Sequence, residues 1–126
     1  MKTEIYSNNA PKPIGPYSQA IKHGNMIFIS GQIAMDYQNS NIINENIAEE
    51  TETVMKNIMS ILKESGCNFQ NIVKCSIFLS DMSLFDEVNK IYSKYFSHPF
   101  PARETVEVSK LPKNVNVEIS AIAIMK

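Results

Sequence analysis

Arginine is almost absent from this sequence. Arg103 is the single guanidinium, and eleven lysines supply the rest of the basic charge. Lysine serves wherever a plain positive charge is enough, whereas arginine is irreplaceable where a planar fork must hold a carboxylate or phosphate through two parallel hydrogen bonds. The alternative is a surface charge that happens to be an arginine. The scarcity makes Arg103 a candidate binding residue.

Cysteine and histidine are also scarce. Cys67 and Cys75 form no C-x-x-C pair, and His23 and His98 are the only histidines. These four residues do not make the ligand set of a structural zinc site. We therefore expect neither a bound metal nor a disulfide.

No block of like charge stands out, since thirteen acidic and twelve basic residues leave a formal charge of -1. Binding to nucleic acid or to an anionic membrane needs a concentrated positive surface, so neither partner is expected. The longest apolar runs, MIFI and AIAIM, are too short to span a bilayer, and MKTEIYSNN lacks the apolar core of a signal peptide. We expect a soluble, cytoplasmic protein.

Familiar catalytic motifs are missing as well. The sequence contains no G-x-S-x-G elbow, no Walker loop and no dinucleotide fingerprint. Each of these motifs places a nucleophile or a phosphate-binding backbone at a defined turn. Serine hydrolase, NTPase and Rossmann functions are therefore excluded.

The 126 residues, 44 % of them apolar, fit one domain spanning 1–126. Asn46 and Glu49 are placed as a cap pair for a helix that ends at Gly66, and Asp81 or Ser83 caps a second helix over 84–96. Alternation and turn signals predict strands over 4–6, 18–22, 26–30, 72–79, 102–108 and 115–125. The order β-β-β-α-β-α-β-β predicts an α+β fold, a mixed sheet with both helices packed on one face.

The last two strands are predicted to form a hairpin. If Val108 pairs with Val115, then Arg103 and Glu118 become diagonal neighbours, about 7 to 8 Å apart between backbones, on the face that the helices leave bare. Thr105 would share that face, with Val106 and Val108 on the helix side. An Arg and a Glu so placed are either a cross-strand ion pair or a catalytic pair.

The bare face would also carry Ile122 and Ile124. Apolar side chains beside polar ones on an open sheet face indicate contact between subunits. We therefore expect a homo-oligomer with polar groups near the interfaces between its subunits.

Four further residues are candidates, each with a structural alternative. Tyr17, in a loop stiffened by prolines, either points into a site or only packs. Ser30 and Gly31 at a strand end either offer a hydroxyl and a backbone N–H to an anion or simply turn the chain. Asn89, among the apolar positions of the second helix, is either a satisfied amide or a ligand contact.

Four segments resemble the reactive intermediate deaminase family, RidA, also called YjgF. The pair formed by P-A-R and V-E-I at this separation is specific, whereas SGQ alone is weak. The segments are IGPYSQA (14–20), SGQIA (30–34), VNKIYSKYF (88–96) and FPARETVEVSKLPKNVNVEISAIA (100–123).

The resemblance implies a chorismate-mutase-like fold in a homotrimer with sites between subunits. It implies hydrolysis of 2-imino acids such as 2-iminobutanoate and 2-iminopropanoate, products of pyridoxal-phosphate dehydratases, to 2-oxo acids and ammonia without a cofactor. Other members are described as endoribonucleases, translation inhibitors or regulatory binding modules. The implied roles are carboxylate binding by Arg103, water positioning by Glu118, and pocket contacts by Tyr17, Ser30, Gly31 and Asn89.

One position departs from the common pattern of the family. Many members carry P-A-R-S-C, whereas this chain has Glu104 and Thr105 in place of the Ser-Cys pair. A nucleophilic cysteine is not required, because water attacks an imine directly. We expect only the backbone N–H of Thr105 to contact the substrate.

Overall fold

The computed structural model describes residues 1–126 and confirms the predicted order of strands and helices. The second helix is shorter than the predicted 84–96, and the last strand is shorter than 115–125. No helix is both long and apolar enough to cross a membrane. In chain order the elements are β1 (Thr3–Ile5), β2 (Ala20–His23), β3 (Met26–Gln32), α1 (Ile47–Glu64), β4 (Ile72–Leu79), α2 (Phe85–Ser93), β5 (Ala102–Glu107) and β6 (Val117–Ile124), with short 3-10 turns at Phe69–Asn71, Met82–Leu84 and Pro112–Asn114.

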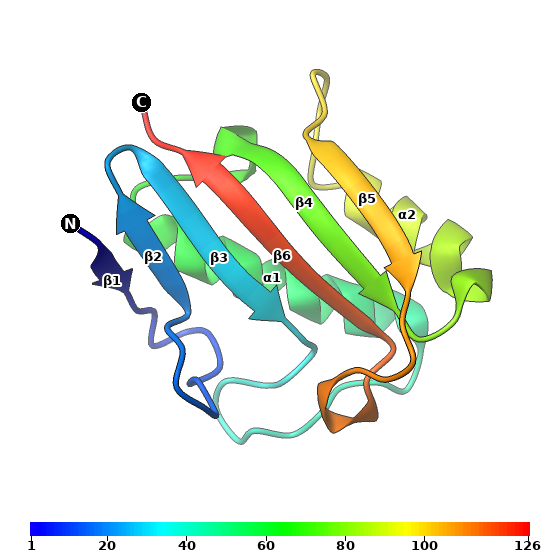
Figure 1. Ribbon diagram of the computed structural model, residues 1–126. Coiled ribbons are helices and arrows are strands. Elements are labelled where there is room, and N and C mark those ends of the chain that lie inside the picture. Colours follow the sequence, from blue (N-terminus) through cyan, green and yellow to red (C-terminus); the bar gives the residue numbers. More distant parts are fainter.

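The six strands form one mixed sheet in the order β1-β2-β3-β6-β4-β5. Only β4 and β5 run parallel, and all other neighbours are antiparallel. Both helices lie on the same face of this sheet, and the other face is open (Figure 1). The predicted α+β class is therefore confirmed.

Helix α1 begins and ends where the sequence signals predict. The side chain of Asn46 accepts a hydrogen bond of 2.8 Å from the N–H of Glu49, which satisfies one of the free donors of the first turn. Gly66 follows the last turn with φ +73°, a left-handed conformation that glycine adopts at little cost.

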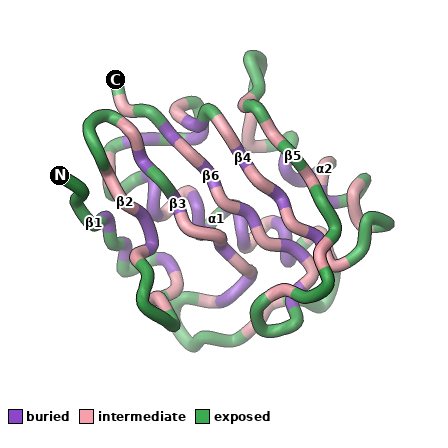
Figure 2. Tube along the Cα trace, viewed as in Figure 1, coloured by how far each residue is buried: buried purple, intermediate pink, exposed green.

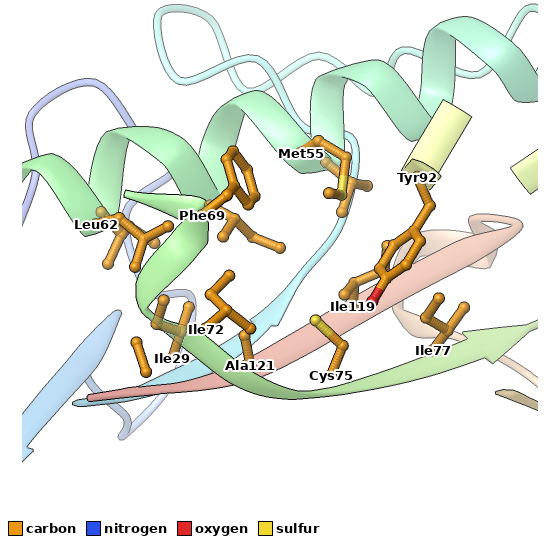
Figure 3. Close-up of a cluster of buried hydrophobic side chains, with 14 of the residues drawn as sticks. Ile29, Met55, Leu62, Phe69, Ile72, Cys75, Ile77, Tyr92, Ile119 and Ala121 are labelled. Atoms are coloured by element: carbon orange, nitrogen blue, oxygen red, sulfur yellow. The ribbon is translucent and has the colours of Figure 1, made fainter. Parts of the chain in front are cut away.

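The core fills the space between the helices and the sheet. Met55 and Leu62 from α1 point into the same buried cluster as apolar side chains of β4 and β6, such as Ile77 and Ile119 (Figure 3). Tyr92 descends from α2 into the same layer, and only 5 % of its surface is exposed. This packing holds α2 firmly against the sheet edge that carries β5.

The predicted hairpin between the last two strands is wrong. β6 pairs with β3 and β4, whereas β5 pairs only with β4 and forms the sheet edge. The connection 108–116 therefore passes the end of β4 and spans two strand spacings, about 10 Å. Strands adjacent in sequence are usually also adjacent in a sheet, but here a third strand lies between them.

The true register reverses the predicted orientation of β5. Arg103 is aligned with Cys75 of β4, which in turn is aligned with Ala121 of β6, and these residues face the helices. Glu118 is aligned with Phe78 on the opposite face. The predicted diagonal approach of Arg103 and Glu118 on the bare face is therefore also wrong.

The prediction for β6 itself is confirmed. Its side chains alternate between buried and more exposed, and Ile122 and Ile124 lie on the open face. Phe28 and Val106 add to this face and are 41 % and 42 % exposed. Buried and more exposed stretches alternate along β6 and β4 (Figure 2). Apolar side chains therefore lie on the open face at β3–β6 and again at β4–β5, with polar side chains such as Lys74 and Ser76 between them.

Candidate active site

The predicted site residues other than Thr105 lie around two separate hollows. The first, named here the glutamate pocket, has a volume of about 350 Å³ and is lined by Ile14, Tyr17, Ser30, Gly31, Ile33, Pro112 and Glu118. The second, the arginine pocket, has a volume of about 420 Å³ and is lined by Asn89, Tyr92, Ser93, Phe100, Pro101 and Arg103. Four predicted residues thus come together in the first pocket and two in the second.

Glu118 and Gly31 fit against each other across β6 and β3. A Cβ on residue 31 would lie 2.8 Å from Cδ and 3.1 Å from Cγ of Glu118, so the carboxylate occupies space that only glycine leaves free. Burial alone raises the pKa of Glu118, since no cation of the same chain opposes it. The pocket thus holds a carboxyl group suited to exchange a proton.

Tyr17 and Ser30 complete the polar wall of the glutamate pocket. The Tyr17 hydroxyl accepts a bond of 3.3 Å from the N–H of Ile14, which leaves its own proton free for donation. Ser30 donates its hydroxyl to the carbonyl of Ser18 at 2.6 Å. Its oxygen can therefore still accept a hydrogen bond from a ligand, but its proton is occupied.

Gln19, which the sequence did not single out, holds the loop before Tyr17. Its side chain is buried and accepts a 2.6 Å bond from the N–H of Ser7. It also donates to the carbonyls of Ser7, Ala10 and Pro11 at 3.1, 3.3 and 2.9 Å. This one amide satisfies several groups of a segment without regular structure, so the loop has a fixed path.

Glu50 of α1 was also missed, and it anchors the start of β6. Its carboxylate is fully buried and accepts bonds from the N–H of Asn116 at 2.7 Å and of Val117 at 3.2 Å. It also accepts the Asn116 side-chain amide at 2.8 Å. Glu50 lies one turn before Val54 on the apolar side of α1, and this position in the sequence could have indicated a buried acid. Its hydrogen bonds fix the start of β6, the strand that carries Glu118.

Arg103 lies beneath α2 in the arginine pocket. Its Nη1 donates to Oδ1 of Asn89 at 2.6 Å. Its Cζ lies 5.0 Å from the centre of the Tyr92 ring and 5.6 Å from that of Phe85. The one ion pair of the chain joins Lys74 to Glu104 at 3.1 Å, so Arg103 has no carboxylate partner.

Thr105 lies two residues beyond Arg103 on the same face of β5. Its hydroxyl is buried and has no hydrogen-bond partner. The N–H of Val108 bonds to Leu79 of β4, and alternate residues point to the same side, so the N–H of Thr105 points to the unpaired edge. Glu104 faces the other way, toward Lys74 and Ser76, and does not narrow the arginine pocket.

The two pockets offer complementary chemistry. No group of three or more His, Cys, Asp or Glu side chains is arranged to hold a metal ion. The arginine pocket presents a guanidinium that can bind a carboxylate, and the glutamate pocket presents a group that can orient water and move a proton. Because the guanidinium and the carboxyl lie on opposite faces, one chain does not bring them together.

Comparison with known proteins identifies the family of this chain. The family model described as Endoribonuclease L-PSP matches residues 7–125. A RutC family protein of Pyrococcus horikoshii is 48 % identical over 123 residues, which is 98 % of this chain and 98 % of the relative. The human 2-iminobutanoate/2-iminopropanoate deaminase is 45 % identical over 120 residues, 95 % of this chain and 88 % of the relative.

The fold agrees as well. The crystal structure of a Yersinia pestis protein of the Rid family has a TM-score of 0.96 with this chain at 42 % identity, covering 99 % of this chain and 100 % of that one. A family model over almost the whole sequence, relatives this similar and a matching fold lead to one assignment. The chain belongs to the reactive intermediate deaminase (RidA/YjgF) family, whose sequence model is described as Endoribonuclease L-PSP.

Proposed function

We propose that this protein hydrolyses 2-imino acids, such as 2-iminobutanoate and 2-iminopropanoate, to 2-oxo acids and ammonia in the cytoplasm and without a cofactor. The observation that carries the proposal is the half-buried Glu118, which lies over Gly31 and has a raised pKa. An iminium carbon is already electrophilic, so catalysis needs a held substrate, one placed water and a proton carrier. The name of the human relative supports the same reaction.

The proposed reaction uses both pockets. Arg103 and the N–H of Thr105 bind the substrate carboxylate. Glu118 takes a proton from water while the water oxygen bonds to C2 and the C=N electron pair moves to nitrogen. Starting from the iminium form, this gives a neutral amine; Glu118 then returns the proton to that nitrogen, the C–N bond breaks, and ammonia leaves. The remaining hydroxyl passes its proton to Glu118 and becomes the 2-oxo group. Tyr17 donates to the water, and Ser30 accepts from the nitrogen.

We further propose that the protein is a homotrimer in which the glutamate pocket of one copy meets the arginine pocket of the next. This arrangement would unite Arg103 and Glu118 from opposite faces of two sheets. The apolar side chains of the open face, among them Phe28, Val106 and Ile124, supply a surface for such contact.

The activity is tested with a freshly made substrate. A pyridoxal-phosphate dehydratase generates 2-iminobutanoate in the cuvette, and the release of 2-oxobutanoate and ammonia is followed with and without this protein. We expect clear acceleration by the wild type and a far smaller one by Glu118→Gln. Equal rates with and without the wild type would rule out the deaminase assignment.

The shared site is tested by mixing inactive chains. Arg103→Ala and Glu118→Gln chains are unfolded, combined in equal amounts and refolded. If each site uses Arg103 from one copy and Glu118 from another, random assembly gives about a quarter of the sites both native residues. Refolded wild type is the control. A mixture without activity beside an active control would refute the shared site.

RNA cleavage is the second candidate, because the family model is described as an endoribonuclease. With a single arginine and a net charge of -1, the protein should bind a polyanion such as RNA only weakly. The same preparation should therefore release ammonia from the imino acid and leave RNA intact. RNA cleavage that Glu118→Gln abolishes, without ammonia release by the wild type, would favour the nuclease.

A further inference from the structure

One face of α2 surrounds the guanidinium of Arg103. Phe85, Asn89 and Tyr92 stand at positions i, i+4 and i+7, which share one side of an α-helix. The Asn89 oxygen lies 2.6 Å from Nη1, and both rings lie within 6 Å of Cζ. These three side chains are called the α2 cradle below.

All three members of the cradle are neutral. Asn89 offers an amide oxygen where a carboxylate would also have fitted the donor, and Phe85 offers a ring. Burial raises the pKa of Tyr92, which keeps its phenol uncharged. Arg103 forms no ion pair, so the cradle holds a cation without cancelling its charge.

We propose that the α2 cradle positions Arg103, and that Asn89 is a positioning residue that acts through the guanidinium and does not itself bind substrate. The inference rests on the proposed function, because the ligand of the arginine pocket is taken to be a carboxylate. Asn89 occupies one of the five N–H donors, and the remaining ones are left for the ligand.

A guanidinium held in one orientation favours a planar ligand with two oxygens, such as a carboxylate. A free arginine side chain samples many rotamers, and binding must restrict them. A guanidinium already held by an amide and two rings loses less freedom when it pairs with a carboxylate. The cradle therefore favours substrates with a free carboxylate and disfavours their amides and esters.

Because Arg103 is the only arginine, NMR can measure directly how its guanidinium is held. A ¹⁵N-labelled sample gives one arginine Nε–H signal and one set of Nη signals, all from Arg103. In the wild type the Nη1 and Nη2 protons should be distinct, because the bond to Asn89 hinders rotation. In Asn89→Ala they should merge. Lys90→Ala, on the exposed side of α2, is the matched control and should keep them distinct.

Binding of 2-oxobutanoate, measured by calorimetry, tests the functional side. Asn89→Ala should weaken binding about 10-fold at an unchanged melting temperature, and Arg103→Lys should weaken it at least as much. The double variant Asn89→Ala/Arg103→Lys should bind 2-oxobutanoate as tightly as Arg103→Lys alone, since the Asn89 amide acts only through the guanidinium. Asn89→Asp should keep the Nη signals distinct and still bind poorly, because it cancels the charge.

Two outcomes would overturn the proposal that the α2 cradle positions Arg103. One is additive loss in the double variant, which would make Asn89 an independent substrate ligand. The other is Nη signals that are the same in wild type and Asn89→Ala. Wild-type protein that binds no 2-oxo acid would count against the proposed function, whereas the NMR comparison would still decide how Arg103 is held.

Discussion

Arg103 and Glu118 lie on opposite faces of the same sheet, two strands apart. Their separation leaves the guanidinium among neutral side chains and the carboxyl over Gly31, with no ion pair between them in the chain. Each group therefore keeps the property that the proposed reaction needs: an uncompensated positive charge on one and a raised pKa on the other.

Glu118→Gln should separate chemistry from binding. The amide keeps the shape of the side chain and removes the oxygen that accepts a proton. Turnover should fall by roughly 10² to 10⁴, the usual contribution of a positioned general base. Calorimetric affinity for 2-oxobutanoate should be retained. Near-normal turnover would reduce Glu118 to a structural role.

The raised pKa of Glu118 also predicts how stability depends on pH. The folded chain holds this proton more tightly than the unfolded chain, so ionisation disfavours folding as pH rises through the folded pKa. Glu118→Gln should therefore melt higher than its parent at pH 7 and at the same temperature at pH 3.

This comparison is made in an Arg103→Ala background, where a neighbouring guanidinium cannot hold the carboxylate. Thermal unfolding followed by circular dichroism at both pH values measures it. A difference that is larger at pH 3 than at pH 7 would contradict the sign of the shift.

Gly31→Ala should displace the Glu118 carboxylate. The new methyl would overlap the acid group, and displacement by about 1 Å can lower turnover by roughly 10². Gly15→Ala is the matched control, because its Cβ would meet the Tyr17 ring at an ordinary 3.6 Å. Equal turnover in the two variants would show that the close fit of residues 31 and 118 is not needed.

Thr105→Val should keep the activity and the fold. It replaces a buried hydroxyl that has no partner with a methyl group of similar size, which should leave stability unchanged or raise it by about 1 kcal/mol. Urea unfolding and imine hydrolysis measure the two effects. A loss of turnover as large as that of Glu118→Gln would show that the hydroxyl takes part in the chemistry.

Glu50→Gln should destabilise the fold through the start of β6. The carboxylate accepts three hydrogen bonds, and an amide turns one acceptor into a donor facing an N–H. The expected loss in free energy of unfolding is about 2 kcal/mol. Exposed Glu49→Gln is the control and should change little. Equal unfolding curves for the two variants would show that the buried bonds are replaceable.

Local patterns predicted the elements because each depends on nearby residues. The alternation from Val117 to Ile124 revealed both faces of β6, and Asn46 marked the start of α1. Six site residues were candidates from their residue types and positions, and the resemblance supplied their roles. The structure places these six around two pockets. Their catalytic roles stay predictions.

The position of β5 could not be predicted in this way. The alternation in residues 102–125 shows which side chains share a face of each strand, but it does not show that β4 lies between β5 and β6. The roles of Gln19 and Glu50 were hidden for the same reason, because their partners lie 8 to 12 and 66 to 67 residues away.

The place of β6 has a consequence for biosynthesis. The strand nearest the C-terminus lies in the middle of the sheet and is the only strand joining β1-β2-β3 to β4-β5. Domains often begin to fold from the N-terminus while the chain is still being made. Here a nascent chain that ends before Val117 holds two sheet fragments with unpaired inner edges, so the native sheet can close only after the last strand has left the ribosome. Until then those unpaired inner edges are open to pairing with other chains.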